Sequence, residues 1–84
     1  MMATIVIYTT SWCPFCTRAK KLLDHKNVTY TDVDVSSPDA RAKMVALTGG
    51  RTVPQLVIND KPEGGCDELY ALERSGKLDK LLSR

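Results

Sequence analysis

The sequence lacks the features that membrane and nucleic-acid proteins need. Its longest apolar runs are far too short to cross a bilayer, and its N-terminus has no basic segment followed by the apolar stretch of a secretion signal. Charge of one sign never forms a block, because the 12 basic and 10 acidic residues are spread along the chain and leave a formal net charge of +2. We therefore expect neither a membrane nor a nucleic acid as partner.

Metal-ligating residues are scarce as well. A structural zinc site needs four ligands, and beyond the pair Cys13 and Cys16 the chain offers only Cys66 and His25. We therefore expect no metal site. Three cysteines without a secretion signal also argue against a secreted disulfide scaffold and favour a cytoplasmic location, where a reducing environment keeps thiols reduced.

Proline and glycine, with four and five residues, are too sparse to suggest disorder. A hydrophobic content of 43% and a charged content of 26% are typical of a globular protein. The chain of 84 residues has no linker, repeat or low-complexity stretch, so a single domain over residues 1–84 is predicted.

The most informative feature present is Cys13-Pro14-Phe15-Cys16, which follows an apolar run at residues 5–8 and precedes a helical pattern. The first thiol falls at the helix start, where unpaired N–H groups and the positive end of the helix dipole favour a thiolate. Cys16 comes about one turn later and can close a disulfide with Cys13. A purely structural disulfide is not favoured, since so short a loop removes little entropy from the unfolded chain.

The remaining pattern predicts an α/β fold in the order β-α-β-α-β-β-α. Apolar residues at 4–8 indicate a buried central strand, and alternation over 28–35 indicates a half-buried strand at or near a sheet edge. Further strands are predicted at 55–58 and 61–63, the latter confined to an edge by Pro62. Helices are predicted at 14–26, from 38 to the Gly49-Gly50 stop and at 67–75, with a last apolar turn at 78–82.

The second helix has clear start signals, with Ser37 as N-cap and Pro38 in its first position. Its inward face is expected to carry Ala40, Met44, Val45 and Leu47.

Three motifs in order make the chain resemble a known family: Cys13-Pro14-Phe15-Cys16, Thr52-Val53-Pro54 and Gly64-Gly65-Cys66-Asp67-Glu68-Leu69. Over nearly its whole length the chain resembles the glutaredoxins of the small bacterial dithiol type. The resemblance implies a thioredoxin-like fold, with a four-stranded mixed sheet flanked by three or more helices. It also implies a thiol–disulfide oxidoreductase that takes glutathione as co-substrate, binds no cofactor tightly, and reduces protein–glutathione mixed disulfides and protein disulfides.

Carried over position by position, the resemblance makes Cys13 the attacking thiolate and Cys16 the resolving thiol. It implies that Pro54 is cis and that Val53 pairs its backbone with the cysteinyl part of glutathione. The glutathione contacts that it implies are Phe15, Arg41, Thr52, Val53, Pro54, Gly65, Cys66 and Asp67.

The residue types agree with part of this assignment. A glycine-led helix N-terminus at Gly65 offers N–H groups to a carboxylate, and the Asp67 carboxylate can take an ammonium group. Arg41 matches a family position that contacts the glycine carboxylate of glutathione, and its planar fork suits that group.

Two positions depart from the family pattern. Thr10 stands where many members have a lysine three residues before the nucleophile, and Phe15 replaces the commoner tyrosine. We expect an altered affinity or rate with the same reaction, and Arg41 or Arg51 compensates for the missing charge in this interpretation.

Two alternative functions stay open. One is a carrier of a [2Fe–2S] cluster held by Cys13 of two subunits and two glutathiones, although Pro14 disfavours it. The other is a thioredoxin-type reductase fed by a flavoprotein, against which the Gly-Gly-Cys-Asp element argues. An exposed thiol pair suits a monomer.

Three further side chains stand near the motifs or at a helix end. Trp12, directly before the nucleophile, either contacts substrate or packs beside the motif. Cys66 is expected to be a packed free thiol, and His25 a solvated residue at a helix end that complements the dipole.

Overall fold

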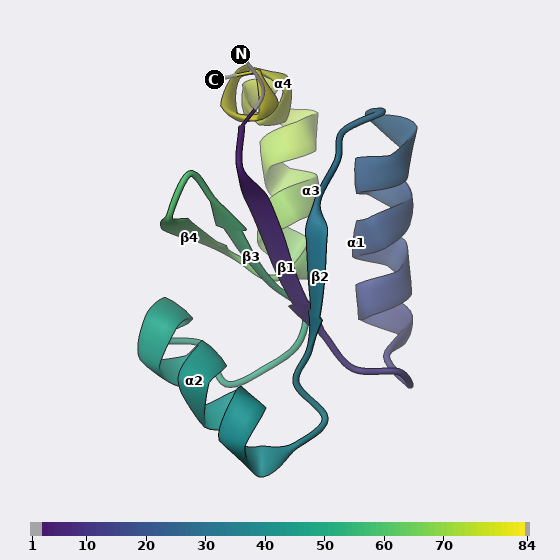
Figure 1. Cartoon of the computed structure of the whole chain (residues 1–84). Coiled ribbons are helices and arrows are strands. Elements are labelled where there is room, and N and C mark those ends of the chain that lie inside the picture. The colour runs from purple at the N-terminus through teal and green to yellow at the C-terminus, as the bar shows by residue number, and fades with distance from the viewer. Residues whose placement is uncertain (1–2, 84) are drawn as a thin grey trace.

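The computed structural model describes residues 3–83. Four strands and four helices follow one another as β1 (Ile5–Thr9), α1 (Pro14–His25), β2 (Thr31–Asp34), α2 (Pro38–Thr48), β3 (Gln55–Ile58), β4 (Lys61–Gly64), α3 (Cys66–Arg74) and α4 (Lys77–Leu82). Figure 1 shows the strands forming one twisted sheet, with α1 and α3 beside each other and α2 set apart from them. The predicted order is confirmed, and the last apolar turn is a short helix.

The sheet has the strand order β2-β1-β3-β4 and is mixed. β1 pairs parallel with β2 and antiparallel with β3, opposing Ile7 to Asp32 on one side and to Leu56 on the other. The first strand is therefore central, and β2 and β4 are edges, as the sequence predicts. β2 is shorter than the predicted 28–35, because only Thr31–Asp34 pairs with β1.

The main core lies between the sheet and the helices α1, α3 and α4. It contains Ala3, Ile5, Ile7, Ala19, Leu22, Leu23, Leu56, Ile58, Leu69, Leu78 and Leu82, all buried. The apolar face of α1 packs here because its buried residues recur at helical spacing. Lys26, just after α1, forms ion pairs with Glu73 of α3 and Asp79 of α4, at 2.7 and 2.9 Å. The helix α1 is therefore held by apolar packing along one side and by these ion pairs at its C-terminal end.

The helix α2 begins at Pro38 as predicted, but the set of residues on its inward face differs from the expected one. Ser37 Oγ accepts a hydrogen bond from the Ala40 N–H at 3.2 Å, and Gly49 ends the helix with φ +74°. Leu47, expected inside, is 63% exposed, so that expectation is wrong. Met44 is the buried residue of α2, with Ala40, Val45 and Thr48 half-buried beside it, and the Thr48 hydroxyl donates to the Met44 carbonyl. Leu47 lies beside these residues, in water.

Within residues 3–83, no helix is long and apolar enough to cross a membrane.

Candidate active site

Cys13 is the N-cap of α1. Its backbone is extended, at φ −132° and ψ 106°, and its Sγ accepts the Cys16 N–H at 3.3 Å. Pro14 follows at the first helical position, where its missing N–H leaves nothing unpaired. The thiol sulfur therefore takes the place of the oxygen that usually caps a helix, at the end where backbone N–H groups and the helix dipole favour negative charge.

The same sulfur lies next to the loop before β3. Cys13 Sγ donates to the Val53 carbonyl at 3.7 Å, and the Val53–Pro54 peptide bond is cis, as the resemblance implies. The neighbouring Gln55 is buried, and its Nε2 donates to the Thr52 carbonyl at 2.9 Å and to Thr52 Oγ1 at 3.3 Å. Gln55 thus ties down the loop that faces the nucleophile. Sequence reasoning read it only as a strand residue.

The two thiols of the motif differ in accessibility. Cys13 is half-buried and Cys16 is 1% exposed, and both are in the free thiol form. Burial, helped by the neighbouring Cys13, raises the pKa of the Cys16 thiol from 9.0 to about 11. Cys16 therefore holds its proton at neutral pH, whereas Cys13 can be reached from outside.

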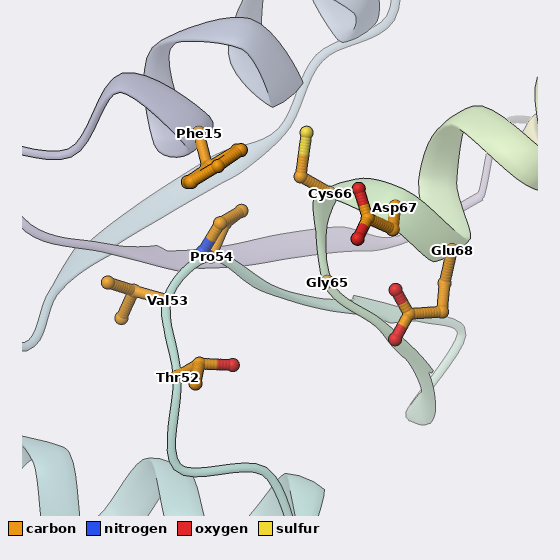
Figure 2. Close-up of a pocket in the computed structure, with 8 residues that line it drawn as sticks. All are labelled: Phe15, Thr52, Val53, Pro54, Gly65, Cys66, Asp67 and Glu68. Carbon is orange, nitrogen blue, oxygen red and sulfur yellow. The ribbon is translucent and has the colours of Figure 1, made fainter.

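Beside Cys13 the structure forms a groove with a volume of about 330 Å³. Figure 2 shows the loop 52–54 on one side of it, the start of α3 on the other and Phe15 at one end. The residues that line it are Phe15, Thr52, Val53, Pro54, Gly65, Cys66, Asp67 and Glu68. These are all the expected glutathione contacts except Arg41, together with one that sequence reasoning missed, Glu68. The Gly-Gly-Cys-Asp-Glu run could have indicated Glu68, because it lies three residues after the cap Gly65 and so belongs to the first turn of α3, beside the groove.

The wall formed by α3 depends on glycine. Gly65 is the N-cap and makes no side-chain cap, so the first N–H groups of α3 remain available to a ligand. A Cβ at Gly65 would lie 3.1 Å from the Pro54 carbonyl oxygen, so only glycine lets the two walls approach this closely. Cys66 is buried, which raises the pKa of its thiol, in keeping with a packed free cysteine.

The structure does not bring Arg41 into the groove. Its exposed guanidinium donates to the Arg51 carbonyl at 3.1 Å, and neither arginine lines the cavity. A cation does lie near Thr10: Lys20 shares a small polar pocket with it and pairs with Asp32 at 2.9 Å. Sequence reasoning missed Lys20, although its place four residues after Cys16 puts it on the same helix face.

Two further expectations concern single residues. Trp12 is 96% exposed, so packing beside the motif is excluded. His25 is the last residue of α1 and is exposed, as expected for a solvated helix end.

The chain resembles known proteins along most of its length. A family model described as Glutaredoxin matches residues 5–62. "Glutaredoxin" of Pseudomonas aeruginosa is 51% identical over 83 residues, covering 98% of this chain and 99% of that protein. "Glutaredoxin 3" of Escherichia coli K12 is 45% identical over 82 residues, covering 96% and 99%.

Solved structures agree in fold. The solution structure of a glutaredoxin from Brucella melitensis is 47% identical and superposes with a TM-score of 0.86, covering 98% of this chain and 90% of that one. A crystal structure of a buckwheat glutaredoxin–glutathione complex is 33% identical and has a TM-score of 0.86, covering 95% and 76%.

Proposed function

The chain belongs to the glutaredoxin family and is a thiol–disulfide oxidoreductase, and from that premise we propose that it uses glutathione to reduce protein–glutathione mixed disulfides and protein disulfides through Cys13 and Cys16. One observation carries the proposal. Cys13 Sγ caps a helix and also lies 3.7 Å from the Val53 carbonyl, at the edge of a groove. The groove volume of about 330 Å³ falls within the range of small-molecule sites.

The first step is an attack on a mixed disulfide. The Cys13 thiolate attacks the glutathione sulfur, a new bond joins Cys13 to glutathione, and the substrate cysteine leaves as a thiolate that takes up a proton from water. The N-terminus of α1 stabilises the charge on Cys13 before the attack.

Glutathione would lie along the groove. Its cysteinyl part would pair with the Val53 backbone, and its γ-glutamyl carboxylate would accept N–H groups at the uncapped start of α3. Asp67 would take the ammonium group. The rest of the proposed contact surface is Phe15, Thr52, Pro54, Gly65 and Cys66. Arg41 stays a proposed contact for the glycine carboxylate, and this role requires its side chain to leave the Arg51 carbonyl.

The cycle closes in one of two ways. A second glutathione thiolate attacks the glutathione sulfur bound to Cys13, which releases glutathione disulfide and restores the Cys13 thiolate. With a protein disulfide, Cys13 becomes joined to the protein, and Cys16 attacks Cys13 Sγ to release the protein thiol and leave a Cys13–Cys16 disulfide. Cys16 must lose its proton for this attack, and its burial makes that costly.

We further propose that residues 1–84 work as one domain and as a monomer in a reducing cytoplasm, with glutathione and thiol-containing proteins as partners. Cys13 is a free, half-buried thiol, and a reducing compartment keeps such thiols reduced.

The test compares the wild type with Cys13→Ser and Cys16→Ser in the reduction of the cysteine–glutathione mixed disulfide by glutathione. Serine keeps the helix cap but is not ionised at neutral pH, so Cys13→Ser should lose at least ~10³-fold in rate. Cys16→Ser should stay active, since glutathione resolves the intermediate. Full activity without Cys13, or none in the wild type, would overturn the proposal.

A further inference from the structure

The most exposed large apolar side chain in residues 3–83 stands directly before the nucleophile. Trp12 is 96% exposed and is the only tryptophan of the chain. Tryptophan is usually well buried, because its ring exposes a large apolar area to water. Leaving it outside has a cost that the packing of this chain does not explain.

The two aromatic side chains around Cys13 have different surroundings. Phe15, 53% exposed, lines the groove, whereas Trp12 is not among the residues that line it. Trp12 is nevertheless the chain neighbour of the nucleophile: the Cα atoms of residues 12 and 13 are about 3.8 Å apart, and Cys13 is held as the helix cap. An exposed aromatic residue therefore adjoins the nucleophile in the chain and is not part of the groove that glutathione would fill.

We propose that Trp12 contacts the polypeptide on either side of the substrate's cysteine and so determines the preference for protein over small-molecule disulfides. This inference rests on the proposed function. The preferred partner is an extended segment with an apolar residue next to its cysteine, because such a side chain can cover one face of the indole ring.

The geometry of the reaction carries this choice of partner. In thiol–disulfide exchange the attacking sulfur, the central sulfur and the leaving sulfur line up. With glutathione in the groove beside Cys13, the leaving cysteine lies on the far side of the glutathione sulfur. The residues flanking that cysteine must then pass over the surface around residue 13. Trp12 is the exposed apolar side chain there that glutathione leaves free, and tryptophan is prominent among residues that dominate binding energy.

The kinetic test uses three glutathione mixed disulfides. Two are tryptophan-free octapeptides with one glutathionylated cysteine, flanked by leucines in the first and by serines in the second; the third is the cysteine–glutathione disulfide. Trp12→Ala should lower kcat/KM for the leucine peptide about tenfold, for the serine peptide less, and for cysteine–glutathione by at most about twofold. Trp12→Phe should restore most of the loss. Phe15→Ala, a change in the groove, should impair all three substrates alike.

A fluorescence experiment reports the contact directly. The Cys16→Ser variant is joined through Cys13 either to the leucine peptide or to glutathione by reaction with their thiopyridyl disulfides, with pyridinethione as leaving group. The emission of the single tryptophan should move to shorter wavelength in the peptide conjugate and stay in place in the glutathione conjugate.

Four results would overturn the inference. An equal loss on all three substrates in Trp12→Ala would mean that the residue only shapes the motif. No loss on the leucine peptide, or no spectral difference between the conjugates, would mean that no contact forms. A wild type that is inactive on every substrate would overturn the proposed function as well, so the two failures are distinguishable.

Discussion

The starts of α1 and α2 have nearly the same local structure. Each helix has proline in its first position and a capping side chain that accepts the N–H three residues later, Cys13 Sγ at 3.3 Å in α1 and Ser37 Oγ at 3.2 Å in α2. The difference lies in the capping atom and its neighbours. Ser37 is exposed and caps only its own helix, whereas Cys13 Sγ also contacts the Val53 carbonyl beside the groove.

A structural helix cap and a reactive site can therefore differ by little more than the capping atom and what it contacts. The same hydrogen bond that stabilises a hydroxyl cap in α2 stabilises a sulfur that can ionise in α1. The start of α3 goes one step further, because Gly65 provides no side-chain cap and leaves the N–H groups to a ligand. The fold thus has three kinds of helix start. The start of α2 is closed by a hydroxyl cap, the start of α1 has a reactive sulfur as its cap, and the start of α3 is open, with no side-chain cap.

After the loss expected for Cys13→Ser, the largest effect is expected from the second cysteine of the α1 start. Burial is the first cause of the raised pKa of the Cys16 thiol and persists when Cys13 is joined to a peptide, so this thiol should stay protonated at neutral pH. The release of a peptide joined to Cys13, measured by stopped flow without glutathione, should therefore speed up about tenfold per pH unit from pH 7 to 9. Release that levels off by pH 8 would contradict this origin, and Cys16→Ser, the control, should release nothing.

The open start of α3 can be closed by one methyl group. Gly65→Ala places a Cβ 3.1 Å from the Pro54 carbonyl oxygen and forces the groove walls apart by a few tenths of an ångström. We expect kcat/KM for cysteine–glutathione to fall about tenfold, or ~1.4 kcal/mol, mainly through KM.

Gly49→Ala is the matched control. Its Cβ would meet no atom within 4 Å, but φ is +74°, so the change should lower the free energy of unfolding by about 1 kcal/mol and leave kcat/KM unchanged. Equal activity in both variants would show that the close approach at Gly65 does not shape the groove.

The helix starts were predictable because their signals are local. Proline after a capping residue and glycine at a helix end act within a few positions, so Ser37, Pro38 and Gly49 could be read directly. The central and edge strands followed from burial patterns in the same way. The thiol pair was readable from its spacing at a helix start, whereas the groove residues were implied by the resemblance to the glutaredoxins.

Other features depend on how separate elements pack. The rotation of α2 that exposes Leu47 and turns Thr48 inward is decided by the fit of the helix to the sheet. Arg41 was expected in the groove from its position in the sequence alone, but its side chain binds the Arg51 carbonyl. The burial of Gln55 against the 50–52 loop likewise joins groups that sequence patterns treat separately.

The smallest effect is expected at the closed helix start, and it separates capping from catalysis. Ser37→Ala removes the acceptor for the Ala40 N–H and should lower the free energy of unfolding by ~1 kcal/mol, measured by urea titration. Activity should not change, because Ser37 lies outside the groove. Ser37→Asp should keep the stability, since a carboxylate caps the helix and suits its dipole. Cys13→Ser should show the reverse, with its cap kept and its activity lost, so a loss of activity in Ser37→Ala would break the distinction between the two helix starts.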